Sequence, residues 1–486
     1  MKRRLGRMIA LALLGAVLMS GCGERNEKPT EETTASADTN EEETVDMTEV
    51  IAEVGFVGET PKLDVRKSKA ERKYFTGTTN KDAVAYETGE DMWFTINLLA
   101  SGEKVSCPKF RYTVAADDGR TPTVGYVEGI SGTLTLGVKL GVPGFVHVQV
   151  EACDENGEPI KGVDIFDGGA GADIEKIQKL KTEPADFDAF WSAQLKALDA
   201  TAPDPIEIRE VTSPKAGFTV YAVKLRFSPN NTWGDYAAGY LSVPTGAKPG
   251  SLSLCLTLWG AGTFDPSIEC AQGRATLSLS PHSLELGQSA AYYNELRDGK
   301  LKGYGFNETY NAARETVYFR EMILRDVQAM RFLKTHLSAA GTDARFSGLW
   351  DGKNLTLSGG SQGGMQCAAV AALEPGATFV ELYCPWFCDV GGCGTDGRQG
   401  STYMPKWTEA LEYYDSVNFA KRITCKVTIV SAGLGDYVAT PAGITAFYNS
   451  LGSSVSKKIT YVQNCTHSYN PVDRKGYTRS HEAAKN

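Results

Sequence analysis

The sequence predicts an all-β, immunoglobulin-like sandwich followed by a larger α/β domain with a mainly parallel sheet. Between residues 90 and 152, short runs alternate between apolar and polar residues and are separated by Gly, Asp and Pro, as in antiparallel sheets. After about residue 172, strand-like runs alternate with helical patterns, which is typical of parallel sheets. The length of 486 residues allows two or three domains with sizeable cores.

The first predicted domain covers residues 51–172. Its period-two alternation is clearest in four runs, at 93–98, 110–114, 134–138 and 146–150. A glycine-rich stretch at 168–171 closes this domain.

The second predicted domain covers residues 173–486. Buried strands are expected at 251–259, 354–357, 378–384 and 425–431. Between the first two, apolar residues recur at helical spacing over 315–338 and predict a long helix.

The start of the chain has the features of an export signal. Residues 1–22 carry a basic start and an apolar run at 8–19, which is too short to span a bilayer. The run ends in Ser20-Gly21-Cys22, which resembles the lipobox of bacterial lipoproteins, so Cys22 is expected to be lipidated. An ordinary cleavage site or a short anchor is the alternative. The prediction is a lipoprotein exported to the periplasmic face or the cell surface.

Residues 23–50 are rich in Glu, Thr and Ser and contain no aromatic residue, which predicts a disordered acidic tether. The whole chain has 50 Lys and Arg against 59 Asp and Glu, a net charge of −9. This balance lacks the basic character of nucleic-acid-binding proteins, so nucleic acid is not an expected partner, and the membrane is expected only through the lipid.

Ten of the eleven cysteines follow Cys22. Cys107 and Cys153 are the only two in the first domain, and an oxidising compartment would allow them to pair. Cys384, Cys388 and Cys393 cluster without the spacing or the histidine of a zinc site, so buried thiols or one bridge are expected there.

The predicted strand that ends at Leu357 leads into Gly359-Gly360-Ser361-Gln362-Gly363-Gly364, and an alanine-rich helix follows at 365–373. A G-x-S-x-G motif between a strand and a helix is typical of a nucleophile elbow, in which a sharp turn exposes the serine hydroxyl. Side chains at Gly359 and Gly363 would clash in such a turn. The pattern predicts Ser361 as a nucleophile.

A serine nucleophile needs a base that takes its proton. In proteins with this motif the order along the chain is serine, then the acid, then the histidine base. Two of the five histidines, His467 and His481, follow Ser361. His467 comes shortly after the apolar run 459–462, at the carboxyl end of a predicted strand, whereas His481 lies in a polar tail. We therefore expect His467 to be the base.

The third member of the site is expected to be Asp436, which follows the strand-like run 427–431 and would orient the imidazolium. The alternative for Asp436 is a helix N-cap ahead of Pro441. Asp389 and Asp415 are the competing candidates for the acid.

Together these segments resemble carbohydrate esterase family 7, the acetyl xylan esterases and cephalosporin C deacetylases, over residues 180–470. The resemblance is carried by the segments 184–191 (PADFDAFW), 239–244 (GYLSVP), 359–364 (GGSQGG), 433–436 (GLGD) and His467.

The resemblance implies an α/β-hydrolase fold with Ser361, Asp436 and His467 as a triad. It also implies that the backbone N–H of Gln362 is one oxyanion donor and that the loop 260–262, with Ala261 as the best-placed residue, supplies the other. No cofactor or metal is implied. The chain departs from the family where Ser280-Pro281-His282-Ser283 replaces an Arg-Gly-Gln motif, and where Ser468 stands in place of Glu. His282 is either a substitute for part of that motif or a simple loop residue.

The leading hypothesis is an exported serine esterase that removes acetyl groups from xylan or xylo-oligosaccharides. A prolyl-oligopeptidase-type peptidase and a non-catalytic glycan-binding lipoprotein are the alternatives, although the first domain is too short for the propeller of such a peptidase. Trp259, Trp386 and Phe387 lie near predicted strand ends and are candidates for the wall of an acetyl pocket; core packing is the alternative for each.

Overall fold

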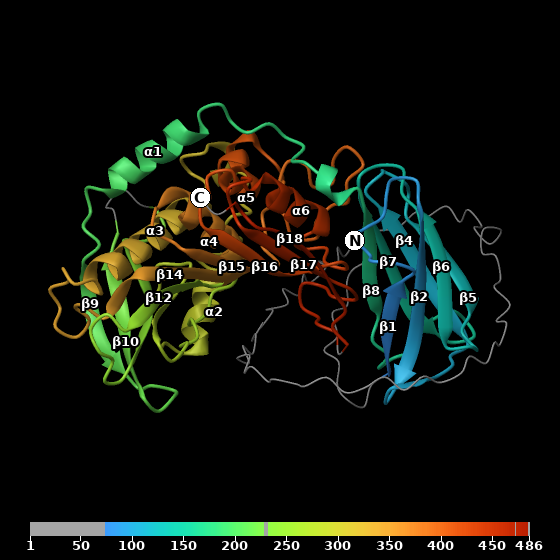
Figure 1. Ribbon diagram of the computed structural model, residues 1–486, viewed down its shortest axis with the longest axis horizontal. Coiled ribbons are helices and arrows are strands. Elements are labelled where there is room, and N and C mark those ends of the chain that lie inside the picture. Colours follow the sequence, from blue (N-terminus) through green and yellow to red (C-terminus); the bar gives the residue numbers. More distant parts are fainter. Residues whose placement is uncertain (1–72, 228–231, 472, 485–486) are drawn as a thin grey trace, which may run out of the picture.

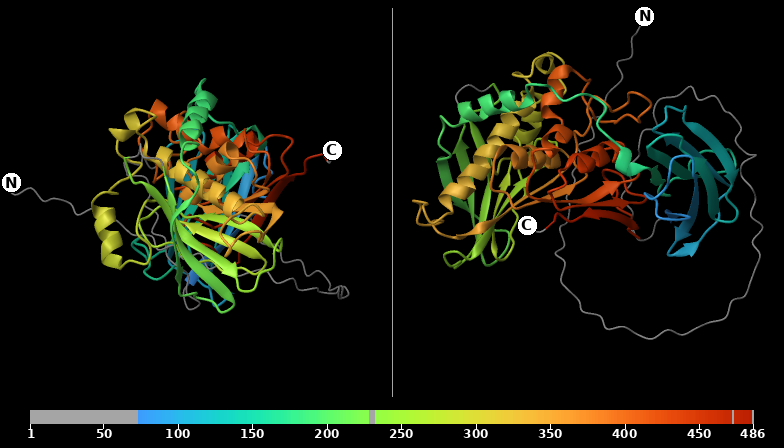
Figure 2. Two further views of the ribbon diagram at one scale, coloured as in Figure 1. Left: turned by 90° about the vertical axis from the view of Figure 1, so that its left-hand side faces the viewer. Right: turned by 45° about the horizontal axis from the view of Figure 1, so that its top comes forward.

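The computed structural model describes residues 73–227, 232–471 and 473–484 and divides them into a small β-sheet body and a large α/β body (Figure 1). The small body lies at one end of the large sheet, beside its C-terminal strands, in Figure 1 and in the right-hand view of Figure 2. The predicted signal segment, Cys22 and the tether lie outside the described residues. Within the described residues, none of the helices combines the length and apolar character needed to cross a membrane.

The small body consists of two four-stranded antiparallel sheets. One sheet contains β1 (Lys73–Thr79), β2 (Asp91–Ala100), β3 (Glu103–Lys104) and β6 (Thr133–Lys139), and the other has the order β5 (Thr123–Glu128), β4 (Lys109–Ala116), β7 (Gly144–Cys153) and β8 (Phe166–Ala172). The four runs predicted from alternation lie within β2, β4, β6 and β7. Phe75 and Phe110 meet edge to face at 5.8 Å between the sheets, so alternate residues of both sheets form a common core. We call this body the sandwich.

The large body contains a ten-stranded sheet. Its spatial order is β18 (Gly476–His481), β17 (Lys457–Val462), β16 (Lys426–Gly433), β15 (Phe379–Tyr383), β14 (Trp350–Gly360), β12 (Leu252–Leu258), β13 (Arg274–Leu279), β11 (Tyr236–Pro244), β10 (Phe218–Arg226) and β9 (Pro205–Val211). The strands from β13 to β17 run parallel, and antiparallel strands flank them on both sides. The prediction of a large, mostly parallel sheet is confirmed.

Helices cover both faces of this sheet (Figure 1). They are α1 (Phe187–Leu198), α2 (Ala290–Asp298), α3 (Tyr318–His336), α4 (Gln362–Leu373), α5 (Ser416–Ala420) and α6 (Pro441–Ser450), with short 3-10 helices at Ile174–Lys176, Tyr310–Ala312 and Glu409–Tyr414. The long helix predicted over 315–338 is α3, whose apolar side chains are buried against the sheet and α4. Tyr293 of α2 packs into a separate apolar cluster with β10 and β11.

The structure corrects one prediction for the small body, a disulfide bridge, and adds one feature that the sequence did not predict, a core shared with the large body. The predicted bridge between Cys107 and Cys153 is absent: both are free thiols. The sulfur of Cys107 faces the backbone carbonyl of Lys109, and that of Cys153 faces the carbonyl of Glu151. The sandwich also shares one continuous apolar core with the large body, in which the Phe145 ring lies 5.8 Å from that of Tyr461 in β17.

Candidate active site

The turn between β14 and α4 places Ser361 at the carboxyl edge of the parallel sheet. Ser361 has φ 55° and ψ −123°, a strained backbone conformation for a residue with a side chain. Its N–H donates to the Tyr383 carbonyl at 2.9 Å, and its carbonyl accepts the N–H of Trp386 at 3.0 Å. Bonds to the neighbouring β15 segment therefore hold the strained turn.

The glycines on either side of Ser361 allow this turn. A Cβ on Gly359 would lie 2.5 Å from the carbonyl oxygen of Gly363, and a Cβ on Gly363 would lie 2.0 Å from that of Leu258 in β12. Both contacts are closer than real Cβ atoms allow. The predicted reason for these glycines, close approach of the backbones, is therefore visible in the structure.

Ser361, His467 and Asp436 form a continuous chain of hydrogen bonds. His467 Nε2 lies 2.8 Å from Ser361 Oγ, and Nδ1 lies 2.9 Å from Asp436 Oδ2. The other oxygen of Asp436 accepts the N–H groups of Val438 and Ala439 at 2.8 and 2.9 Å. Three loops, after β14, β16 and β17, thus bring together the three residues that the sequence predicts for the site.

The geometry assigns the protons of this chain. An ionised carboxylate only accepts hydrogen bonds, so Nδ1 of His467 carries a proton and Nε2 is left to accept the proton of Ser361 Oγ. Burial lowers the pKa of His467, but the charges and hydrogen bonds of Asp436 and, to a smaller extent, of Cys384 together outweigh burial and raise that pKa well above 6.5. The site therefore strengthens His467 as a proton acceptor.

The residues that compete with Asp436 and His467 for the roles of acid and base lie elsewhere in the structure. Asp415 caps α5 through the N–H of Val417 at 2.8 Å, and Asp389 accepts the N–H of Leu180 at 3.0 Å and pairs with Arg398. His481 is exposed at the end of β18, opposite the first residue of β17, which places it at the edge of the sheet remote from Ser361.

The expected oxyanion donors lie on two segments beside Ser361. Gln362 begins α4, so its N–H has no partner within the helix and lies at the positive end of the helix dipole. The loop 260–262, which contains Ala261, passes close by, since a Cβ on Gly260 would lie 3.7 Å from Ser361 Cβ. The structure thus places the loop of Ala261 next to the serine.

His282 is a buried support of the loop 260–262. Its Nε2 donates to the Gly262 carbonyl at 3.0 Å, and its Nδ1 accepts from the Tyr318 hydroxyl. Burial, together with nearby Arg325, lowers the pKa of His282 to about 3, so the ring is neutral and keeps this tautomer. Of the two alternatives for His282, the structure favours a supporting role over that of a simple loop residue.

Tyr304 is a second support that the sequence did not indicate. Its hydroxyl accepts the N–H of Gly262 at 2.9 Å, so both polar groups of Gly262 are fixed. Tyr304 and Tyr318 lie in a loop and at a helix start that carry no motif, and no pattern could have singled them out.

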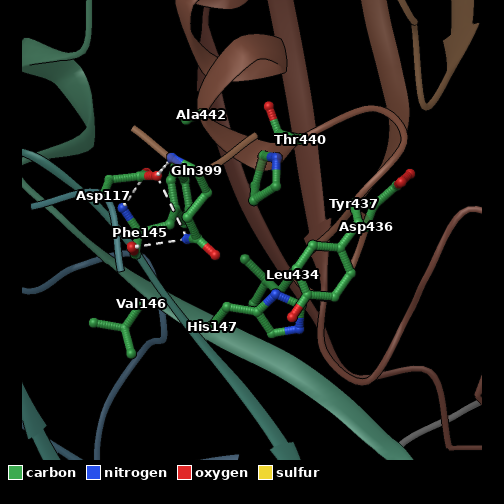
Figure 3. Close-up of a pocket in the computed structure, with 11 residues that line it drawn as sticks. Asp117, Phe145, Val146, His147, Gln399, Leu434, Asp436, Tyr437, Thr440 and Ala442 are labelled. Carbon is green, nitrogen blue, oxygen red and sulfur yellow. Dashed lines mark hydrogen bonds between the residues drawn. The ribbon is translucent and has the colours of Figure 1, made fainter. Parts of the chain in front are cut away.

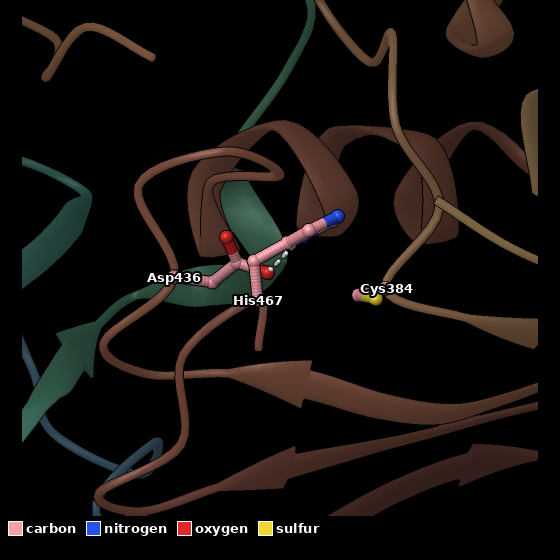
Figure 4. Close-up of side chains that lie close together, drawn as sticks. All are labelled: Cys384, Asp436 and His467. Carbon is pink, nitrogen blue, oxygen red and sulfur yellow. Dashed lines mark hydrogen bonds and ion pairs between the residues drawn. The ribbon is translucent and has the colours of Figure 1, made fainter. Parts of the chain in front are cut away.

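Cys384 also lies at the site, directly after β15 (Figure 4). Its sulfur, a carboxylate oxygen of Asp436 and a ring nitrogen of His467 all lie within 4.8 Å of one another, which is close enough for metal ligands. Both ring nitrogens of His467 already take part in the hydrogen bonds to Asp436 and Ser361. The arrangement is therefore explained by a hydrogen-bonded triad with a thiol beside it. The position of Cys384 at the end of a predicted strand is the sequence feature that could have placed it near the site.

The three aromatic candidates for a pocket wall are placed differently. Phe387 is fully buried and packs on Phe319 at 4.9 Å, so it belongs to the core. Trp386 is also buried, but its N–H bonds to Ser361 and its indole N–H donates to the carbonyl of Tyr403 at 2.7 Å. Trp259 immediately precedes the loop 260–262 and is half-buried.

Comparisons with known proteins identify the family of this chain. The family model for acetyl xylan esterase (AXE1) matches residues 171–393 and 401–479, more than half of the chain. The acetyl esterase Axe7A of Xylanibacter ruminicola is 26% identical over 332 residues, which cover 65% of this chain and 70% of that protein.

Solved structures that are similar include acetyl xylan esterases from two bacteria. The one from Paenibacillus sp. R4 is 17% identical with a TM-score of 0.46, and the match covers 60% of this chain and 93% of that one. The one from Thermoanaerobacterium sp. JW/SL YS485 is 18% identical with a TM-score of 0.46, over 62% and 93% of the respective chains.

The family match decides between the hypotheses drawn from the sequence. It supports an esterase over a peptidase or a non-catalytic glycan-binding protein. The chain belongs to the acetyl xylan esterase family and is a serine carboxylic ester hydrolase.

Proposed function

We propose that this chain hydrolyses acetyl esters of xylan or xylo-oligosaccharides by a Ser-His-Asp acyl-enzyme mechanism on an α/β-hydrolase fold. The observation that carries the proposal is the hydrogen-bonded chain from Ser361 Oγ through His467 to Asp436, with bonds of 2.8 and 2.9 Å. The acetyl esterase activity named for the Xylanibacter relative supports the choice of acyl group.

The first half of the reaction transfers the acetyl group to the enzyme. Ser361 Oγ attacks the ester carbonyl while His467 Nε2 takes its proton, and Asp436 stabilises the imidazolium. The N–H groups of Gln362 and Ala261 stabilise the oxyanion. The imidazolium then protonates the leaving sugar oxygen, so the C–O bond breaks and an acetyl-serine remains.

The second half returns the enzyme to its starting state. Water attacks the acetyl-serine carbonyl and gives its proton to His467 Nε2, and the same two N–H groups stabilise the new oxyanion. The imidazolium then returns its proton to Ser361 Oγ as acetate leaves. No metal or organic cofactor has a place in these steps.

One assay tests the proposed function. The purified chain is incubated with p-nitrophenyl acetate, acetylated xylo-oligosaccharide and a peptide amide. We expect acetate release from the first two and no cleavage of the amide. Cleavage of the amide, or failure to deacetylate the oligosaccharide, would refute the proposal.

Acyl chain length should strongly affect the rate. We propose that a short acyl pocket beside Ser361 excludes longer acyl chains, with Trp386, whose backbone N–H donates to the Ser361 carbonyl, as the candidate for its wall. Each methylene that such a pocket excludes costs roughly 1–3 kcal/mol, or about 10–200-fold in kcat/KM. We expect kcat/KM to fall from the p-nitrophenyl ester of acetate to those of propionate and butyrate; a rising series would contradict acetyl selectivity.

We also propose that the protein is exported and anchored to a membrane through a diacylglyceryl group on Cys22. The motif at 20–22 and the acidic segment 23–50 support this. Mass spectrometry of the membrane fraction should find the lipid on an N-terminal Cys22, and Cys22→Ala should release the enzyme from that fraction. A free thiol at Cys22 in the mature protein would refute the anchor.

A further inference from the structure

The outer edge of β8 faces the large body of the protein. β8 ends one sheet of the sandwich, so β7 bonds to only one of its sides, yet all seven of its residues are buried. A buried strand edge must find partners for its N–H and C=O groups. Those partners show what the sandwich is docked on.

Two side-chain amides of the large body, from Gln463 and Asn464, bond to this edge, while the N–H of Gly171 further along it donates to the carbonyl of Ala83 within the sandwich. Gln463 accepts the N–H of Gly169 and donates to its carbonyl, both at 2.9 Å, as a neighbouring strand would do. Asn464 accepts the N–H of Asp167 and donates to the carbonyl of Phe75 in β1, also at 2.9 Å. Both side chains are 2% exposed. They directly follow β17 and precede His467 by four and three residues.

The loop that carries Asp436 rests on the same edge. A Cβ on Gly435 would lie 2.2 Å from the carbonyl oxygen of Asp167, so the two backbones are in close contact. The next residue after the acid, Tyr437, stacks its ring on His147 of β7 with centroids 3.9 Å apart (Figure 3). His147 in turn pairs with the buried carboxylate of Asp167.

The junction between these parts is closely packed. The cavity lined by His147, Asp117 and Phe145 of the sandwich and by Asp436 and Gln399 of the large body has a volume of about 10 Å³ (Figure 3). This is room for roughly one water molecule and not for a sugar. This cavity is therefore too small to hold a sugar substrate.

We propose that the edge of β8 positions the loops that carry Asp436 and His467, so that Gln463 and Asn464 are positioning residues for the triad. The inference rests on the proposed catalytic roles of Asp436 and His467. It gives the sandwich a role in the reaction, because a small displacement of a base relative to its nucleophile costs a large factor in rate.

Gly168→Ala in β8 tests this from the sandwich side, in the full chain. The new Cβ would lie 2.1 Å from Gln463 Oε1 and would displace that amide; it would also lie 2.8 Å from the Phe166 ring within β8, while none of its three nearest atoms belongs to the triad. We expect kcat for p-nitrophenyl acetate to fall about 10–100-fold with KM little changed, because orientation and not binding is altered. Gly141→Ala, where a Cβ meets nothing within 4 Å, is the matched control and should keep wild-type kcat.

Gln463→Met tests the positioning role from the side of the large body. Met keeps the length of the side chain but loses both hydrogen bonds to Gly169. Asn449→Leu is its control, because Asn449 in α6 also donates two bonds, to the carbonyls of Ile174 and Ile177 at 2.8 Å, away from the catalytic loops. Both variants should lower Tm. Only Gln463→Met should lower kcat and slow the reaction of Ser361 with a fluorophosphonate.

Rates are measured well below each Tm, so that the folded fraction does not limit them. Wild-type kcat and labelling rate in folded Gly168→Ala and Gln463→Met would overturn the positioning role. If Gly168→Ala does not fold, Gln463→Met decides alone. Failure of the proposed function has a different signature, namely that wild-type Ser361 is not labelled at all.

Discussion

Ser361→Ala and His467→Ala should each reduce kcat for p-nitrophenyl acetate by about 10⁴–10⁶-fold, with little change in KM. The two losses should be similar, and the double variant should be no worse than either single one. The reason is that Ser361 Oγ and His467 Nε2, 2.8 Å apart, act as one unit, so removing either disables the proton transfer. Steady-state kinetics on the three variants measure this.

His481→Ala is the matched control for the histidine variant. His481 is exposed and its Nε2 lies 2.7 Å from the Ser453 carbonyl, remote from the serine. Its replacement should leave kcat unchanged. A dead His481→Ala enzyme, or additive losses in the double variant, would contradict the assigned roles.

Asp436→Asn should reduce kcat by about 10⁴-fold while the fold is kept. The asparagine oxygen can still accept the N–H groups of Val438 and Ala439, so the loop should stay in place. Its NH₂ group, however, would face His467 Nδ1 and force the proton onto Nε2, which then cannot accept from Ser361. Kinetics together with Tm separate this effect from unfolding.

The pH dependence of the same variant provides a second measurement. Only neutral His467 accepts a proton, so wild-type kcat/KM should fall as the pH drops below the raised pKa of His467. Because the Asp436 carboxylate contributes more to that rise than Cys384 does, the residual activity of Asp436→Asn should persist to lower pH. An unchanged acidic limb would show that Asp436 does not set the pKa of His467.

Much of the site could be predicted from local sequence. The glycines around Ser361 are explained by the close approach of the backbones in a sharp turn. The strand before Ser361 and the helix after it show that this turn exposes the serine hydroxyl. The preference for His467 over His481 depended on strand ends. In parallel strands the carboxyl ends share one edge, so residues that follow β14, β16 and β17 converge without further information.

Other features depend on contacts between distant segments and leave no local pattern. Tyr304 and Tyr318 act through single hydroxyl groups on loop 260–262 and on His282. Strands β9 to β11 form an antiparallel extension of the sheet, which the alternation of strand and helix patterns predicted after residue 172 did not indicate. The glycines of β8, which the sequence places at the end of the first domain, also bring the backbone of this strand against Gln463 and Gly435.

The same reasoning explains the unpaired cysteines. Cys107 and Cys153 share one domain, which made a bridge plausible by count alone. The number of cysteines in a domain does not fix the positions of their side chains, and in the structure the two thiols face the carbonyls of Lys109 and Glu151 instead.

The most direct test of the account is to identify the residue that a fluorophosphonate labels. The reagent forms a stable phosphonyl ester with an activated serine, and peptide mapping locates it. We predict a single label on Ser361 that is lost in Ser361→Ala and strongly slowed in His467→Ala. Labelling of another residue, including the neighbouring Cys384, or undiminished labelling of Ser361→Ala, would contradict the account.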